Sequence, residues 1–123
     1  MSPDLQAALL ALRRGEETAR RRAVSELAGS LRPEAIAPLL GAVSDDSWGV
    51  RQAAIEALAA FPQESLLPAL ESALRDDEDA GLRNAAMEIY VRLGGSAAPP
   101  LLALLRDTDE EVRLFAAVML GTL

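Results

Sequence analysis

An internal repeat is the feature that most constrains how this chain can fold. Four segments begin with an arginine and continue with the same pattern of alanine and large apolar residues. The arginines are Arg20, Arg51, Arg83 and Arg113, and their successive positions differ by 31, 32 and 30. An aspartate recurs between them at a constant spacing of 31, at Asp45, Asp76 and Asp107. Two markers that keep one period predict an array of similar structural units.

Each unit is predicted to contain two helices. Segments 51–61 and 66–74 both place apolar residues at i, i+3, i+4 and i+7, which is the spacing of one helix face. The chain has 24 Ala and 22 Leu but only 3% aromatic residues, so helices are favoured over strands. Proline, glycine and serine residues separate the two helices of a unit. Acidic turns separate successive units, where they are expected to cap the next helix.

The repeat pattern resembles the HEAT-like repeats of the phycobilisome lyase type. The resemblance rests on the period near 31, the helix pair and an aspartate followed six positions later by an arginine. It covers nearly the whole chain, and the matching pairs are Asp45/Arg51, Asp77/Arg83 and Asp107/Arg113. We interpret these pairs as a structural ladder of charge-assisted hydrogen bonds. The first repeat departs from the pattern, since Gly15 follows two arginines there, and Arg20 is expected to use Glu16 or Glu17 instead.

The predicted fold class is all-α, a right-handed α-α superhelix of the HEAT/armadillo-like solenoid type with about eight helices. We expect a single domain over residues 1–123. It comprises a half-repeat at 1–15, repeats at about 16–46, 47–77 and 78–108, and a half-repeat at 109–123. The last segment is apolar nearly all round, whereas terminal repeats normally carry a polar outer face. We therefore expect either the N-terminal part of a longer array or a C-terminal helix that packs end to end against another copy.

Composition excludes several kinds of chemistry. The chain has no Cys and no His, so a disulfide, a thiolate nucleophile, an imidazole base and an ordinary zinc site cannot be built. Twelve arginines face 19 acidic residues, and the net charge of −7 disfavours binding to a phosphate backbone. The longest uncharged run, 93–105, is shorter than a membrane span and contains glycines and prolines. We expect a bacterial, cytoplasmic protein without metal, cofactor, nucleic acid or membrane.

The candidate binding surface lies on the second helix of each unit, which the resemblance places on the concave side of the solenoid. Helical geometry points Pro68, Ser72 and Arg75 away from the core, with Glu71 beside them. The repeat register extends these positions into four columns: Ala37/Pro68/Pro99, Gly41/Ser72/Ala103, Ser44/Arg75/Arg106 and Leu40/Glu71/Leu102. The predicted binding residues taken from these columns are Gly41, Ser44, Pro68, Glu71, Ser72, Arg75, Leu102, Ala103 and Arg106.

Two interpretations of the small, uncharged central column are open. One is a groove that accepts an extended peptide or an amphipathic helix. The other is a crowded inner curve in which only small residues fit. Trp48 is likewise either an interface anchor or part of the core.

Two charged features have simpler interpretations. The cluster Asp76-Asp77-Glu78-Asp79 lacks the ligand spacing of a calcium loop and is interpreted as a solvated turn. Residues 1–30 carry five arginines against four acids, and the remainder carries seven against 15. This asymmetry is suited to orienting an acidic partner on the N-terminal end, or it is simply an exposed helix face.

The leading functional hypothesis is a non-enzymatic scaffold that binds an unidentified protein or peptide on the concave face. The alternative, which the resemblance allows, is a bilin lyase-related subunit that assists chromophore attachment. Deoxyhypusine hydroxylases also contain such repeats but need His-Glu pairs at an iron site, and this chain has no His. HEAT-like alkylpurine glycosylases use a basic groove, which fits a chain of net charge −7 poorly. The chain is expected to be a monomer or to self-associate through its apolar C-terminal helix.

Overall fold

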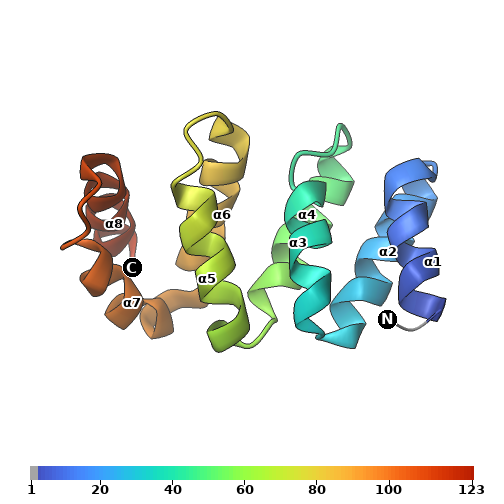
Figure 1. Ribbon diagram of the computed structural model, residues 1–123, viewed down its shortest axis with the longest axis horizontal. Coiled ribbons are helices and arrows are strands. Elements are labelled where there is room, and N and C mark those ends of the chain that lie inside the picture. The colour runs from blue at the N-terminus through green and yellow to red at the C-terminus, as the bar shows by residue number, and fades with distance from the viewer. Residues whose placement is uncertain (1–2) are drawn as a thin grey trace. The chain divides into compact units, whose positions relative to one another are not determined.

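The computed structural model describes residues 3–123, and all regular structure in that range is helical (Figure 1). The α-helices are α1 Pro3–Arg14, α2 Glu17–Ser30, α3 Ile36–Ala42, α4 Trp48–Ala59, α5 Gln63–Leu74, α6 Ala80–Leu93, α7 Ala98–Leu104 and α8 Glu110–Thr122. Helices α2, α4, α6 and α8 contain the repeated arginines, and we refer to them as first-type helices. Helices α1, α3, α5 and α7 are the second-type helices. The prediction of an all-α fold with about eight helices is confirmed.

Side chains in the acidic turns set where the first-type helices begin. Ser47, Asp79 and Asp109 are the N-cap residues of α4, α6 and α8, and each side chain accepts a hydrogen bond from a backbone N–H of the first turn. These N–H groups have no partner within the helix, so capping satisfies them and typically stabilises a helix by about 1 kcal/mol. The capping role predicted for the turns is confirmed.

The second-type helices begin in two different ways. Short 3-10 turns precede α3 and α7, namely η1 Pro33–Ala35 and η2 Gly94–Ala97. Helix α5 has no such turn and runs continuously from Gln63. In the repeat register Pro68 corresponds to Pro99, which lies in the first turn of α7. Pro68 is therefore inside its helix because α5 begins one turn earlier than its counterparts.

The chain forms two compact units, one ending at Ala69 and the other beginning at Leu70. In the first unit α1 packs on α2, and α2 and α3 both pack on α4. Gly15 makes the α1–α2 turn possible, because a Cβ there would lie 2.5 Å from the carbonyl oxygen of Ala11. The core of this unit is built from fully buried apolar side chains such as Leu27, Leu39 and Leu58.

In the second unit α6 and α7 both pack on α8. Its core contains Leu70, Ile89, Leu101 and Met119, all fully buried. The apolar arc predicted for α5 is buried at Leu70, Ala73 and Leu74 in this unit. Helical periodicity therefore identified the buried face correctly, since the spacing of apolar residues is what lets one face enter the core.

Candidate functional site

The regularly recurring aspartates organise the turns between repeats. The carboxylates of Asp45, Asp76 and Asp107 each accept a hydrogen bond from the backbone N–H two positions later, at 2.9, 3.0 and 2.9 Å. A short polar side chain that bonds to its own backbone in this way stabilises a turn. The same turn is thus built three times from one residue type.

The arginines of the first-type helices bind backbone carbonyls of these turns. Arg51 and Arg113 donate to the carbonyl oxygens of Asp45 and Asp107, both at 2.8 Å. Arg83 donates to the carbonyl of Asp76. The predicted pairing of Arg83 with Asp77 is therefore wrong, because the turn from Asp76 to Asp79 contains one extra residue. The predicted ladder of charge-assisted hydrogen bonds is present at Asp45/Arg51 and Asp107/Arg113, where each guanidinium binds the backbone carbonyl oxygen of the aspartate.

Arg20 is the arginine of the first repeat, and it makes more contacts than predicted. Its Nη1 donates to the carbonyl of Gly15 at 3.0 Å, as in the other repeats. Its Nε and Nη2 also donate to both carboxylate oxygens of Asp45, at 2.9 and 3.1 Å, and Nη2 reaches Asp46 at 3.1 Å. The predicted use of Glu16 or Glu17 is wrong. Glu17 instead accepts a hydrogen bond from the Ser47 hydroxyl at 3.0 Å.

The Arg20 ion pair changes the acidity of Asp45. Burial raises the pKa of the Asp45 carboxyl, but the hydrogen bonds from Arg20 and from the Ser47 N–H outweigh this and lower the pKa overall. Asp45 remains a carboxylate at neutral pH. It fastens the α3–α4 turn to the start of α2.

Arg75 forms an ion pair with a turn aspartate in the second unit. Its guanidinium binds both carboxylate oxygens of Asp107, with Nη1 to Oδ1 at 2.9 Å. The hydrogen bond from Arg75, followed by that from the Asp109 N–H, lowers the pKa of Asp107 to about 2. Arg75 was predicted to be a binding residue, but in the structure its charge is already paired with Asp107.

The other predicted binding residues are all at the surface. Gly41, Ser44 and Pro68 are exposed in the first unit, and Glu71 is half-buried in the second. The remaining exposed positions, all in the second unit, are Ser72, Leu102, Ala103 and Arg106.

Gly41 distinguishes between the two interpretations of the small-residue column. A Cβ added at Gly41 would have no other atom within 4 Å. The crowding interpretation is therefore wrong at this position, because a larger side chain would fit. Gly41 leaves space that the packing of the chain does not use.

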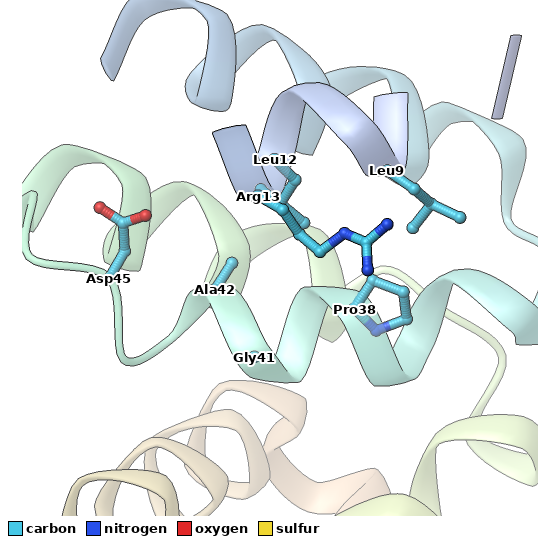
Figure 2. A pocket seen from close by; sticks show the side chains of 7 residues that line it. All are labelled: Leu9, Leu12, Arg13, Pro38, Gly41, Ala42 and Asp45. Atoms are coloured by element: carbon cyan, nitrogen blue, oxygen red, sulfur yellow. The ribbon is translucent and has the colours of Figure 1, made fainter. Parts of the chain in front are cut away.

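That space is part of a pocket between α1 and α3, with a volume of about 510 Å³ (Figure 2). We call it the α1–α3 pocket. Its lining residues come from α1, from α3 and from the turn after α3, and they are Leu9, Leu12, Arg13, Pro38, Gly41, Ala42 and Asp45. Figure 2 shows the Arg13 guanidinium directed toward Pro38, with Asp45 farther away. The pocket thus has a mostly apolar lining with a cationic group on one side.

The sequence prediction missed the contribution of α1 to this pocket. The four columns of predicted binding positions began at α3. Helix α1, the half-repeat at the N-terminus, is also a second-type helix and was left out. One further step of the same register leads from Leu40 to Leu9 and from Ser44 to Arg13. The repeat itself therefore contained the signal that would have found both residues.

Trp48 is at the surface, at the first position of α4, with 69% of its area exposed. The interpretation of Trp48 as part of the core is wrong. Within residues 3–123 no group of three or more acidic side chains is arranged to hold a metal ion. In the cluster that begins at Asp76, two carboxylates accept backbone N–H bonds, those of Asp76 and Asp79.

Comparison with known proteins identifies the repeat. A family model for HEAT repeats matches residues 5–90, and the chain belongs to this family. It is an all-α solenoid of helical repeats, a class that generally mediates interactions between proteins. A search of curated proteins found no match.

Among solved structures, the crystal structure of an engineered protein from the Northeast Structural Genomics Consortium is similar, with 19% identity and a TM-score of 0.47. The alignment covers 98% of this chain and 62% of the engineered one, so the chain spans less than two thirds of that protein. None of the helices between Pro3 and Thr122 has the length and apolar character needed to cross a bilayer.

Proposed function

We propose that this chain is a non-enzymatic binding module that holds a partner protein on its second-type helices, with the α1–α3 pocket receiving an apolar side chain of the partner. The observation that carries the proposal is the unused space at Gly41. Gly41 lies in the last turn of α3, and no packing contact requires a glycine there. Open space beside an apolar lining is what a partner side chain needs in order to bury itself.

The charges around the pocket indicate the chemistry of the partner. Arg13 lines the pocket and is exposed. Asp45, the acidic residue of the lining, is held by Arg20. The proposed partner segment therefore carries a large apolar side chain with an aspartate or glutamate next to it. Its carboxylate would pair with Arg13 while its apolar group fills the pocket.

A peptide-display selection tests this proposal directly. Random 12-residue peptides are selected on the immobilised full chain, and the enriched peptides are synthesised for affinity measurement. We expect an enriched motif that pairs a large apolar residue with an acidic one. Gly41→Phe, which fills the pocket, is expected to weaken binding of these peptides at least tenfold, and Arg13→Glu is expected to weaken it as well.

The matched control is Gly29→Phe in α2. Gly29 is also an exposed helical glycine with nothing within 4 Å of an added Cβ, but it is not part of the pocket lining. Thermal melts of both variants check that each is folded. Peptides that bind Gly41→Phe as tightly as the wild-type chain would show that the pocket is not the binding site. The bilin lyase-related role stays a prediction, tested by the absorbance change on mixing with bilin.

A further inference from the structure

Helix α8 exposes an apolar stripe that its packing in the second unit leaves uncovered. The stripe consists of Leu114, Ala117, Val118 and Gly121, which share one face of the helix at i, i+3, i+4 and i+7. Leu114 is 60% exposed and Val118 is 52% exposed, and a Cβ at Gly121 would meet nothing within 4 Å. The opposite face of α8 packs into the core of the unit. We call the exposed set the α8 stripe.

The equivalent positions are polar in every other first-type helix. Counting from the repeated arginine, Leu114 corresponds to Arg21, Gln52 and Asn84 in α2, α4 and α6. By the same count, Val118 corresponds to Ser25, Glu56 and Glu88. Apolar residues at these two positions are therefore a property of α8 and not of the repeat.

A further repeat stacked on α8 in the same way would leave Val118 exposed and would cover Leu114 only in part. Helix α4 packs on α2, yet Arg21 and Ser25 stay exposed. Helix α8 packs on α6, yet Asn84 and Glu88 stay exposed. The outer surface of a first-type helix thus remains largely open when the next repeat is in place, although Gln52 of α4 is half-buried and the Arg21 guanidinium lies beside Gly49 of α4. Covering Leu114 and Val118 requires an element that packs across that outer surface.

We propose that the α8 stripe binds the α8 stripe of a second copy of this chain, with the two helices antiparallel about a two-fold axis. With the axis between positions 117 and 118, Leu114 of one copy lies opposite Gly121 of the other. Ala117 then lies opposite Val118. Each large side chain faces a small residue, so the same surface is complementary to itself, as a two-fold interface requires.

The distribution of charge supports a second copy of the chain as the partner of the α8 stripe. Residues 114–123 contain no ionisable side chain, whereas the whole chain carries a net charge of −7. Two copies can therefore meet along this stripe without bringing charged side chains into the contact. This self-association is independent of the α1–α3 pocket, which lies in the first unit.

Sedimentation velocity over a concentration series tests the proposal. We expect the wild-type chain to be a dimer and the double variant Leu114→Gln/Val118→Glu, which carries the residues of α4 at these positions, to be a monomer. The matched control is Leu10→Gln, which removes an apolar side chain that is 47% exposed on α1. This control is expected to remain a dimer. A wild-type chain that is monomeric throughout, or a double variant that still dimerises, would overturn the proposal.

Disulfide trapping gives a second measurement that does not depend on a destabilising change. Because the chain has no cysteine, a single introduced cysteine forms a disulfide only between copies. Ala117→Cys lies next to the proposed axis and is expected to yield a covalent dimer under mild oxidation. Ala103→Cys, also exposed in the second unit but on α7, is expected to yield little. Equal trapping at both positions would contradict the proposed axis.

Discussion

At the scale of single residues, Asp107 shows how much one recurring aspartate does. Its carboxylate caps its own turn through the Asp109 N–H and binds Arg75, while its carbonyl accepts a hydrogen bond from Arg113. Three segments of the second unit therefore converge on one residue. Such a residue is expected to be sensitive to protonation, because two of its three contacts need a carboxylate.

Acid titration should reveal the ion pair between Asp107 and Arg75. The pKa of Asp107 is lowered from 3.8 to about 2, so between these values the unfolded chain binds the proton more readily than the folded chain. The contribution of Asp107 to the free energy of unfolding is thus fully present above about pH 4 and is lost as the pH falls toward 2. Arg75→Gln is expected to lose less stability over this range, as measured by urea unfolding at pH 5, 4, 3 and 2. The control Arg106→Gln, at an exposed position, should follow the wild type, and identical pH dependence of all three proteins would refute the assignment.

Tyr90 is a residue whose buried hydroxyl group lowers the stability of the fold. It is fully buried in α6, and no hydrogen-bond partner is found for its hydroxyl among the described residues. Burial raises the pKa of this hydroxyl, since an ionised oxygen would be poorly solvated there. The equivalent positions in α2, α4 and α8 are leucines, Leu27, Leu58 and Leu120.

Replacing Tyr90 by Phe keeps the ring and removes the unpaired hydroxyl. A buried hydroxyl without a partner costs on the order of 1–3 kcal/mol, so Tyr90→Phe is expected to raise the free energy of unfolding by about 1 kcal/mol. Chemical denaturation measures the change. Tyr90→Leu, which matches the other repeats but leaves a gap where the ring was, should be less stable than Tyr90→Phe. A destabilised Tyr90→Phe would mean that the hydroxyl does have a partner.

At the scale of single elements, α5 differs from the other second-type helices because it is longer at its start. Extending the helix to Gln63 places Pro68 in its interior, where proline lacks the N–H that would bond to the preceding turn. Pro99 avoids this cost, since the N–H groups of a first helical turn have no partner within the helix. The proline is thus tolerated in α7 and costly in α5.

Pro68→Ala is therefore expected to stabilise the protein. A proline in a helix interior costs about 3 kcal/mol relative to alanine. Part of this cost is relieved by local adjustment of the helix, so we expect Pro68→Ala to raise the free energy of unfolding by about 1–2 kcal/mol. The melting temperature should rise accordingly. Pro99→Ala is the matched control and is expected to change stability by less than about 1 kcal/mol. Equal effects at both positions would show that helix length is not the cause.

At the scale of the whole molecule, net charge and self-association are coupled. Each copy carries a net charge of −7, so two copies repel one another at long range. The proposed contact contains no ionisable side chain, and salt should therefore act only by screening this repulsion. Raising NaCl from about 50 to 500 mM is expected to lower the dimer dissociation constant several-fold, as measured by sedimentation equilibrium. A dimer that dissociates as salt rises would instead indicate an ionic interface.

The whole molecule also shows which predictions depend on local information. The helix pairs, the capping turns and the buried arc at Leu70, Ala73 and Leu74 follow from residues within one or two turns of each other, and they were predicted correctly. The assignment of Arg83 to Asp77 was wrong, because one extra turn residue moved the carbonyl that the arginine reaches. The interpretation of Trp48 as core was wrong as well, because burial depends on what other elements cover.

Sequence periodicity by itself determined that this protein is an array of paired helices and which face of each helix is buried. These properties depend on short spacings along the chain, which the helix translates directly into position. Only the tertiary structure decided that Arg20 pairs with Asp45 and Arg75 with Asp107, across 25 and 32 residues. It also decided that Gly41 opens into a pocket and that Leu114 and Val118 stay uncovered. Those outcomes depend on how separate helices pack, and the spacing of residues along one helix carries no information about that packing.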